Sequence, residues 1–404
     1  MSDFFIMLLS MVLLGVLISL KINIGFSIFV AAIFLAILKN IGFVPMLVTF
    51  GETLISSETL NMFGVVFLVN LFVSVLRSSG FLDEIVSSFQ KVFSPRLFVP
   101  MFAFIIGALP MPGGALVSAP LVEEGSKTSE ISCEEKAVVN YWFRHIWEPI
   151  SPIYMEIPLM ATIVGVEIPF LVSLQWPLTL GMIISGMLFL VPRIKVKDDF
   201  KVQQGLKLYL DALKSISPIL LVMVLAVVFG INVLISLLFG IALIFAIKRL
   251  NILKVFKAFD LKDLFKMLFL MYAIFLLKGI AINTNLIKGV YTTLIASNIT
   301  PFLILFFLPF VVGVMTGMSA ATFGISYPLL LPLIKPVTIN PLNLFVAYLG
   351  GWTGIMLTPT HLCLSLSIDY FKAKTSRTFQ LLLKNVGLVL FVAFLWTLVL
   401  GFAK

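Results

Sequence analysis

Residues Leu97–Val122 read LFVPMFAFIIGALPMPGGALVSAPLV, an apolar stretch interrupted at its middle by GALPMPGG (Gly107–Gly114). Proline and glycine break helices, so the arms on either side have about 10–13 residues, or about 15–20 Å of helix. That length is about half of a bilayer. The stretch therefore predicts a re-entrant hairpin that enters and leaves the membrane on the same side.

A second stretch, 302–334, has the same design, with GVMTGMSAATFG (Gly313–Gly324) at its middle. Irregular backbone at this depth is tolerated only where protein or a water-filled cavity covers it. We therefore expect both hairpin tips to lie inside the protein.

The rest of the chain is equally apolar. Of its 404 residues, 60% are hydrophobic and 12% are charged, whereas soluble domains carry about 25% charged residues. This composition predicts an all-α polytopic membrane protein. The first run, Phe4–Leu20, lacks the basic start and the small-residue cleavage site of a signal peptide, so we expect a true span. The ten candidate spans are 4–20, 22–38, 61–77, 138–164, 168–191, 216–230, 232–248, 266–282, 343–366 and 380–402.

The two halves of the chain resemble each other. Sliding residues 63–115 by 206 positions pairs Phe63 with Phe269, and it also pairs Pro95 with Pro301 and Gly107 with Gly313. The order of features repeats as well, so each unit would hold five spans and one hairpin. An odd number of crossings inverts the second unit relative to the first.

Loop charges favour the same topology. With both hairpins re-entrant, 25 of the 28 Lys and Arg residues lie in loops or at span ends, and 21 of these 25 fall on one face. If the hairpins crossed the membrane, the division would be 17 against 8. The positive-inside rule therefore predicts a protein of the cell (inner) membrane with both termini outside.

These observations predict the following organisation. The first unit covers 1–191, with a scaffold at about 4–77 and a transport part at about 97–191. A basic cytoplasmic linker, 192–215, leads to the second unit, 216–404, with a scaffold at about 216–282 and a transport part at about 302–402. Segments 81–93 and 285–298 have mixed faces and are expected to be interfacial helices.

This order of elements resembles the ion-transporter superfamily, which includes divalent-anion/sodium symporters, gluconate permeases and the large membrane subunits of tripartite periplasmic transporters. The strings LPMPGGALVSAP (Leu109–Pro120), WFRHIWEPISP (Trp142–Pro152) and GGWTGIMLTPTHL (Gly350–Leu362) are most similar to a prokaryotic family labelled domain of unknown function 401. The resemblance implies an elevator mechanism, with a scaffold that pairs in a homodimer and a mobile transport part. The Ser-Asn-Thr tips of the divalent-anion symporters are not present here, so both H⁺ and Na⁺ stay open as the coupling ion.

The hairpin tips are the first candidate site. Helix ends expose N–H and C=O groups without intrahelical partners, and these bind anions and cations respectively. The alternative is that glycine and proline only form the turns, with small residues permitting close helix packing. The candidate substrate-binding residues of the two tips are Pro110, Met111, Pro112, Gly113, Gly114, Thr316, Gly317, Ser319 and Thr322.

The fourth span is the second candidate site, because charged residues interrupt it. Arg144 and Glu148 lie among apolar neighbours, and Pro149 and Pro152 break the helix. Charges at such depth usually mark a pathway or a paired network. In one interpretation Arg144 and Glu148 form an i,i+4 ion pair. In the other, Arg144 binds an anion, while His145 or Glu148 carries the coupling proton.

The second unit has an equivalent break, which we place at Gly350–Gly354, followed by Thr358-Pro359-Thr360-His361. We expect hydroxyls of this region to complete a pocket facing Ser151. The residues assigned here are Thr353, Thr358 and Thr360 for substrate and His361 for ion coupling. Lys278, within a scaffold span, is expected to be paired or to reach the interface.

Other functional classes have less support. An intramembrane enzyme would need His145, Glu148 and His361 as ligands or as an acid/base pair, but HExxH and GxSxG motifs are missing. A channel or a membrane subunit of a multi-component transporter stays open. The two cysteines, Cys133 and Cys363, predict neither a disulfide framework nor a metal site. We therefore predict an ion-coupled secondary transporter for a small organic anion such as a carboxylate, with no cofactor, no metal, no ATP and no nucleic-acid partner.

Overall fold

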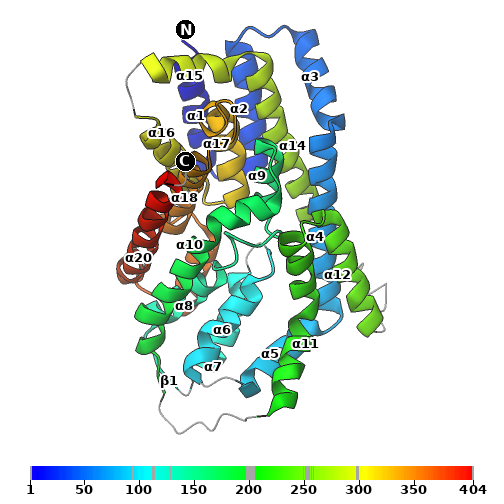
Figure 1. The fold of residues 1–404 in the computed structure, drawn as a ribbon, viewed down its shortest axis with the longest axis vertical. Coiled ribbons are helices and arrows are strands. Elements are labelled where there is room, and N and C mark those ends of the chain that lie inside the picture. The colour runs from blue at the N-terminus through cyan, green and yellow to red at the C-terminus, as the bar shows by residue number, and fades with distance from the viewer. Residues whose placement is uncertain are drawn as a thin grey trace.

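A computed structural model shows an all-α fold with a single pair of two-residue strands among the described residues (Figure 1). The structure describes residues 2–92, 95–111, 114–127, 129–196, 205–248, 250, 255, 257, 259–296 and 300–402. The two strands, β1 (Ser129–Glu130) and β2 (Lys195–Val196), pair antiparallel at the end of the molecule where the 192–215 linker begins.

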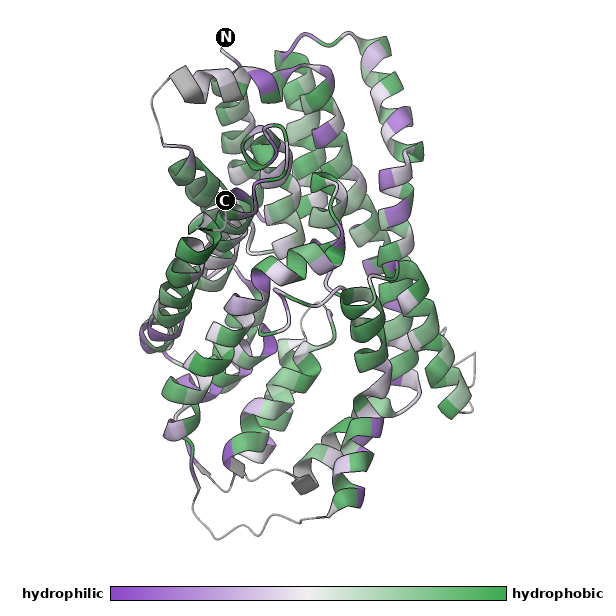
Figure 2. Cartoon of the chain, viewed as in Figure 1, coloured by the Kyte–Doolittle hydropathy of each residue, from purple (hydrophilic) through white to green (hydrophobic). Residues whose placement is uncertain are grey.

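Five helical segments are long and apolar enough to cross a membrane. Their outward faces are apolar as well: α20 exposes Phe391, Phe394 and Leu398, and Figure 2 shows hydrophobic residues along the outer helices. A contiguous apolar surface of this kind suits hydrocarbon and not water. The chain is therefore a helical membrane protein. The five segments are α4 (Ser57–Ser78), α10 with η1 (Ile168–Arg193), α11 with the π-helical turn η2 (Leu206–Val228), α14 (Leu261–Asn283) and α20 (Thr375–Phe402).

Shorter helices occupy the other expected positions. The segments expected at the interface form helices α5 (Phe81–Val92) and α15 (Leu286–Ala296). Three further helices, α1 (Asp3–Ser19), α2 (Ile24–Leu38) and α12 (Val233–Ile247), match expected spans within two residues. Helices of the two halves contact each other: α2 packs on α14, α4 packs on α12, and α10 packs on α20.

Both predicted hairpins consist of two helices and a short tip. The first is α6 (Pro95–Gly107) followed by α7 (Ala115–Gly125), and the second is α16 (Pro301–Thr316) followed by α17 (Ser319–Ile334). Within each hairpin the two arms contact each other. Gly317 ends α16 with a φ of 58°, a left-handed conformation that glycine adopts without strain.

The break in the fourth span is confirmed. Helix α8 (Cys133–Arg144) starts with a capping box between Ser132 and Glu135 and ends at Arg144. Turns continue to residue 155, and α9 (Glu156–Val164) follows. Proline at 149 and 152 explains why the helix cannot run through.

The break in the second unit was placed wrongly. Helix α18 (Pro341–Leu357) runs through Gly350–Gly354 without interruption, and the break lies at Thr358–His361, before α19 (Leu362–Phe371). The glycines serve packing: a Cβ at Gly350 would collide with the carbonyl of Phe306, and a Cβ at Gly354 would collide with that of Phe310. They let α18 lie directly against α16.

Helix α3 (Phe43–Ile55) was not predicted. Polar residues at one face, among them Thr49 and Thr53, interrupt the apolar run that would have indicated it. This face is turned to α14, where Asn283 donates to the Thr49 hydroxyl at 3.3 Å. Nearby, Lys278 forms an ion pair with Glu58 of α4 at 2.7 Å, so the expectation that Lys278 is paired is confirmed.

Replacement of Gly354 by alanine is expected to destabilise the protein, because the new Cβ would overlap the Phe310 carbonyl and force α16 and α18 apart. Overpacking of this kind costs about 1–3 kcal/mol. Gly387→Ala is the matched control, since nothing lies within 4 Å of a Cβ there and alanine favours a helix. Thermal unfolding in detergent should show a lower Tm for Gly354→Ala only. Equal Tm values for the two variants would refute the close α16–α18 contact.

Candidate functional site

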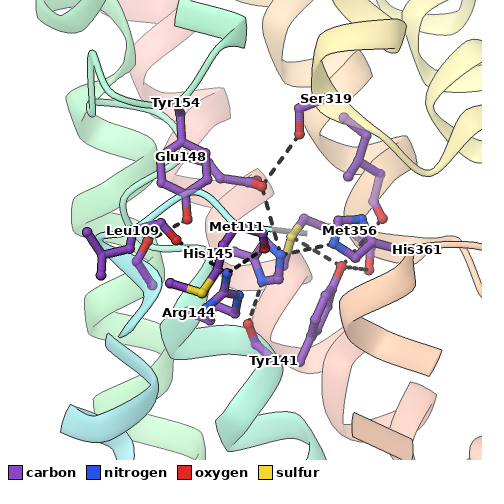
Figure 3. Close-up of polar contacts among 12 residues, drawn as sticks. Leu109, Met111, Tyr141, Arg144, His145, Glu148, Tyr154, Ser319, Met356 and His361 are labelled. Carbon is purple, nitrogen blue, oxygen red and sulfur yellow. Dashed lines mark hydrogen bonds and ion pairs between the residues drawn. The ribbon is translucent and has the colours of Figure 1, made fainter. Parts of the chain in front are cut away.

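A cavity of about 200 Å³ lies where the two hairpin tips meet the two helix breaks (Figure 3). Its walls come from both halves of the chain, and α14 closes it with Met267 and Leu270. The predicted site residues among its lining are Pro110, Met111, Arg144, His145, Glu148, Gly317, Ser319 and His361. Predicted site residues as far apart in the sequence as Pro110 and His361 thus line the same cavity.

Arg144 holds the first hairpin tip. Its side chain is 3% exposed, and its guanidinium donates to the carbonyl of Ile106 at 3.3 Å and to those of Leu109 and Met111 at 3.4 and 3.3 Å. The carbonyls of Ile106 and Met111 also accept the backbone N–H groups of Leu109 and Gly114, each at 3.1 Å, whereas the Leu109 carbonyl has no other donor among the described residues. Arg144 therefore ties the backbone of this turn to the end of α8.

The i,i+4 ion pair between Arg144 and Glu148 is not formed. Because α8 ends at Arg144, the next residues turn away from the helical path, and the two side chains no longer share a face. Glu148 instead lies 3.8 Å from His145 Nε2 and accepts from the Ser319 hydroxyl at 3.5 Å. The carboxylate thus connects the first break to the second hairpin.

Two glycines make the Arg144 contact feasible. A Cβ on Gly114 would occupy the position of the guanidinium, and a Cβ on Gly107 would overlap the Arg144 backbone. The Gly107 carbonyl accepts a hydrogen bond from the Tyr154 hydroxyl. The tip glycines therefore permit close approach of the first break. Pro112 and Gly113, which we also assigned to this tip, lie outside the described residues.

The two histidines meet in the cavity wall. His145 Nε2 and His361 Nε2 are 3.0 Å apart, and His145 Nδ1 is 2.6 Å from the carbonyl oxygen of Tyr141. A carbonyl only accepts, so Nδ1 carries a hydrogen and Nε2 of a neutral His145 turns its lone pair to His361. Both expected ion-coupling histidines are brought into direct contact.

The hydroxyls of the second unit stabilise the backbone. The Thr316 and Thr322 hydroxyls bond each other at 2.9 Å. Thr358 and Thr360 both donate to the Val314 carbonyl, at 2.7 and 3.2 Å. None of these four side chains lines the cavity described above.

Two more predicted residues also lie apart from the cavity lining. Thr353 donates to Leu349 within its own helix at 2.7 Å. Ser151 is buried in the first break. The pocket that we expected to form from Thr353, Thr358, Thr360 and Ser151 is thus not the cavity found here.

Several lining residues were missed. Glu156 at the start of α9, Cys363 in the first turn of α19 and Tyr154 all face the cavity. Glu156 was visible in the sequence as a charge in the fourth span, whereas nothing in the spacing of Cys363 indicated a site. Among the described lining residues, one arginine faces two carboxyl groups, so ionised carboxylates outnumber the cation.

Arg144→Met is expected to lower the Tm, because it removes hydrogen bonds to three backbone carbonyls, and the Leu109 carbonyl has no other donor among the described residues. Each unsatisfied group costs about 1–3 kcal/mol. Arg193→Met is the control: Arg193 pairs with Glu135 at the surface, where an ion pair contributes about 0–1 kcal/mol. Thermal unfolding in detergent compares the two. An Arg144→Met protein as stable as Arg193→Met would contradict the role given to the guanidinium.

Comparison with known proteins adds a family assignment. A search of curated proteins finds no match to this chain. A family model described as "Protein of unknown function (DUF401)" matches residues 2–400, nearly the whole sequence. The chain therefore belongs to the DUF401 family.

Proposed function

We propose that this protein is an ion-coupled secondary transporter that moves a small organic anion, such as a carboxylate, across the cell membrane. The observation that carries the proposal is the cavity bounded by both hairpin tips and both helix breaks, with Arg144, Glu148 and Glu156 in its wall. Discontinuous helices that meet around a buried charged cavity are typical of substrate sites in transporters.

The helix contacts support two inverted repeats. Under the proposed correspondence, α1 to α10 match α11 to α20 apart from the α3 position, and many contacts occur twice. Helix α5 packs on α11 as α15 packs on α1, and α7 packs on α19 as α17 packs on α9. Each hairpin also packs on the broken helix of its own half, α6 on α8 and α16 on α18. This double pattern is what two structurally related units produce, and an odd number of spans in each unit would invert one relative to the other.

The cavity wall supports an anion together with a cation. Arg144 supplies positive charge. The second helix of each hairpin begins at the tip, and the N–H groups at its N-terminus favour anions. Two carboxyl groups, Glu148 and Glu156, would repel an anion unless protons or Na⁺ neutralise them. This balance favours co-transport of the anion with a cation, either H⁺ or Na⁺.

The boundary of the cavity supports an elevator movement. Met267 and Leu270 of α14 belong to the proposed scaffold, and the remaining lining residues belong to the hairpins and breaks. Sliding the hairpin part along α14 would carry the cavity with it. By resemblance to the ion-transporter superfamily, the scaffold helices of two copies would pair in a homodimer.

A thermal-shift screen tests the substrate class. Organic anions, amino acids and inorganic anions are added to purified protein, and the shift is compared within each variant. A ligand at 100 times its Kd stabilises by about 2.7 kcal/mol, which is several degrees. We expect an organic anion to raise the Tm of the natural protein and of Arg193→Ala, but not that of Arg144→Ala. Stabilisation by neutral or cationic solutes alone would reject the anion.

Uptake into proteoliposomes tests the coupling ion. If protons are coupled, an inward proton gradient drives uptake of the stabilising anion. Glu148→Gln abolishes this dependence, although the glutamine side chain has nearly the same size and shape as glutamate. If Na⁺ is coupled, removal of sodium stops uptake and the pH gradient has no effect. Uptake that responds to neither gradient would overturn the proposal of ion coupling.

Reporter fusions test the proposed topology. A phosphatase that is active only outside the cytoplasm should be active when fused after Phe402 and inactive when inserted at 197–204. A fluorescent protein that matures only in the cytoplasm should give the opposite result. The same reporter result at both positions would contradict an odd number of spans after the linker.

A further inference from the structure

Three side chains of metal-binding type come together beside the cavity. His145 and His361, the two histidines of the whole sequence, are 216 positions apart and meet at 3.0 Å between their Nε2 atoms. Cys363 completes the group, and the ligand atoms of the three residues all lie within 4.8 Å of one another. The transport proposal uses the histidines only for protons and gives the thiol no role.

The orientation of His145 is that of a metal ligand. Its Nδ1–H is held by the Tyr141 carbonyl at 2.6 Å, which fixes the ring and leaves Nε2 as a free lone pair toward the cluster. Metal-binding histidines almost always donate their other ring N–H to a carbonyl or carboxylate in this way. The ring of Tyr141 also packs against both histidine rings, with centroids 4.5 and 5.3 Å away. Tyr141 of α8 therefore fixes the positions of both histidines.

The distances suit a tetrahedral ion. Bonds of about 2.0–2.3 Å place neighbouring donors about 3.3–3.8 Å apart. The two Nε2 atoms are 3.0 Å apart, and Glu148 Oε1 is 3.8 Å from His145 Nε2. The ligand atoms of His145, His361 and Cys363 spread over up to 4.8 Å, so side-chain movements must draw them closer, and bring Glu148 in, before all four bind one ion.

The donor set selects the class of ion. Two imidazole nitrogens, one thiolate sulfur and one carboxylate oxygen suit Zn²⁺ and similar divalent transition metals. Ca²⁺ and Mg²⁺ prefer all-oxygen sites. The cluster therefore discriminates against the abundant hard cations.

The charges around the cluster also call for a cation. Glu148 and Glu156 both line the cavity, and Glu156 Oε1 has no hydrogen-bond partner among the described residues although its side chain is buried. Arg144 directs donors to three backbone carbonyls. A divalent ion with a thiolate ligand would leave the wall, counted with Arg144 and both carboxylates, without net charge.

We infer that His145, His361 and Cys363 bind one divalent transition-metal ion of the Zn²⁺ class, with Glu148 as the fourth ligand. The site goes beyond the proposed transport function, since it requires neither a particular substrate nor a direction of transport. It also revises our expectation that the chain has no metal site. That expectation rested on sequence spacing, which does not show that residues 145 and 361 meet.

Zn²⁺ binding to reduced, metal-free protein in detergent tests the site. We expect one ion per chain, and Cys363→Ser should weaken binding by more than about 100-fold, because even changes to residues behind the ligands cost about 10–100-fold. The matched control is Cys133→Ser, since Cys133 is exposed at the start of α8 and should leave binding unchanged. Co²⁺ should give a thiolate-to-metal absorption band in the natural protein and in Cys133→Ser, and no such band in Cys363→Ser.

Two results would overturn the inference: a natural protein that binds no Zn²⁺, or a Cys363→Ser protein that binds it as tightly as Cys133→Ser. The Tm of each metal-free variant shows whether it is folded, and His361→Ala provides a second ligand variant. The transport proposal is judged separately. If an anion still shifts the Tm in the presence of a chelator and no metal binds, only the metal site is rejected.

Discussion

The structure depends on satisfying the backbone of two helical hairpins that end inside an apolar protein. A carbonyl left without a donor in hydrocarbon costs several kcal/mol. The first hairpin solves this with a buried guanidinium, which reaches three carbonyls from 106 to 111. The second uses the threonines after α18, which donate to Val314, and a pair of threonines at its own tip. Each tip is therefore tied to the helix break of its own half, and this arrangement places the breaks around the cavity.

The same ties limit how the hairpins can move. A tip that is bonded to its broken helix cannot open alone without leaving buried carbonyls unsatisfied. Contacts between this group and α14 are of a different kind, since Met267 and Leu270 offer only apolar side chains to the cavity. Apolar surfaces resist sliding less than a set of directional hydrogen bonds. The weaker boundary is thus between α14 and the group formed by the two hairpins and their broken helices. The proposed elevator movement would occur along this boundary.

Much of the fold was accessible from the sequence because bilayer thickness imposes lengths on apolar runs. The hairpins were recognised since Pro and Gly divide runs that are otherwise long enough to cross. The second break was misplaced because Gly350–Gly354 indicates both a break and a close helix contact, and only the neighbouring backbone of α16 decides between them. Helix α3 was not predicted because its polar face is covered by α14, a contact between residues more than 200 positions apart.

Arg144, His145, Glu148 and His361 were predicted as site residues because they are rare polar residues in apolar runs. The position of Cys363 beside these residues could not be predicted, because a single cysteine in an apolar span does not indicate a site.

The two broken helices end at different distances from their hairpins, and this difference places the polar residues of the cavity. Helix α8 ends at Arg144, which bonds the first hairpin tip, whereas α18 continues past its glycines to Leu357. Helix α8 ends at Arg144 because Pro149 and Pro152 follow, and the turns after it carry Glu148 to the cavity. Helix α18 runs through Gly350–Gly354 against α16, and its break comes after Leu357, at Thr358–His361. The position of this break brings His361 next to His145, with 3.0 Å between their Nε2 atoms. The contact between the histidines, and with it the polar centre of the cavity, therefore depends on where each of the two helices breaks.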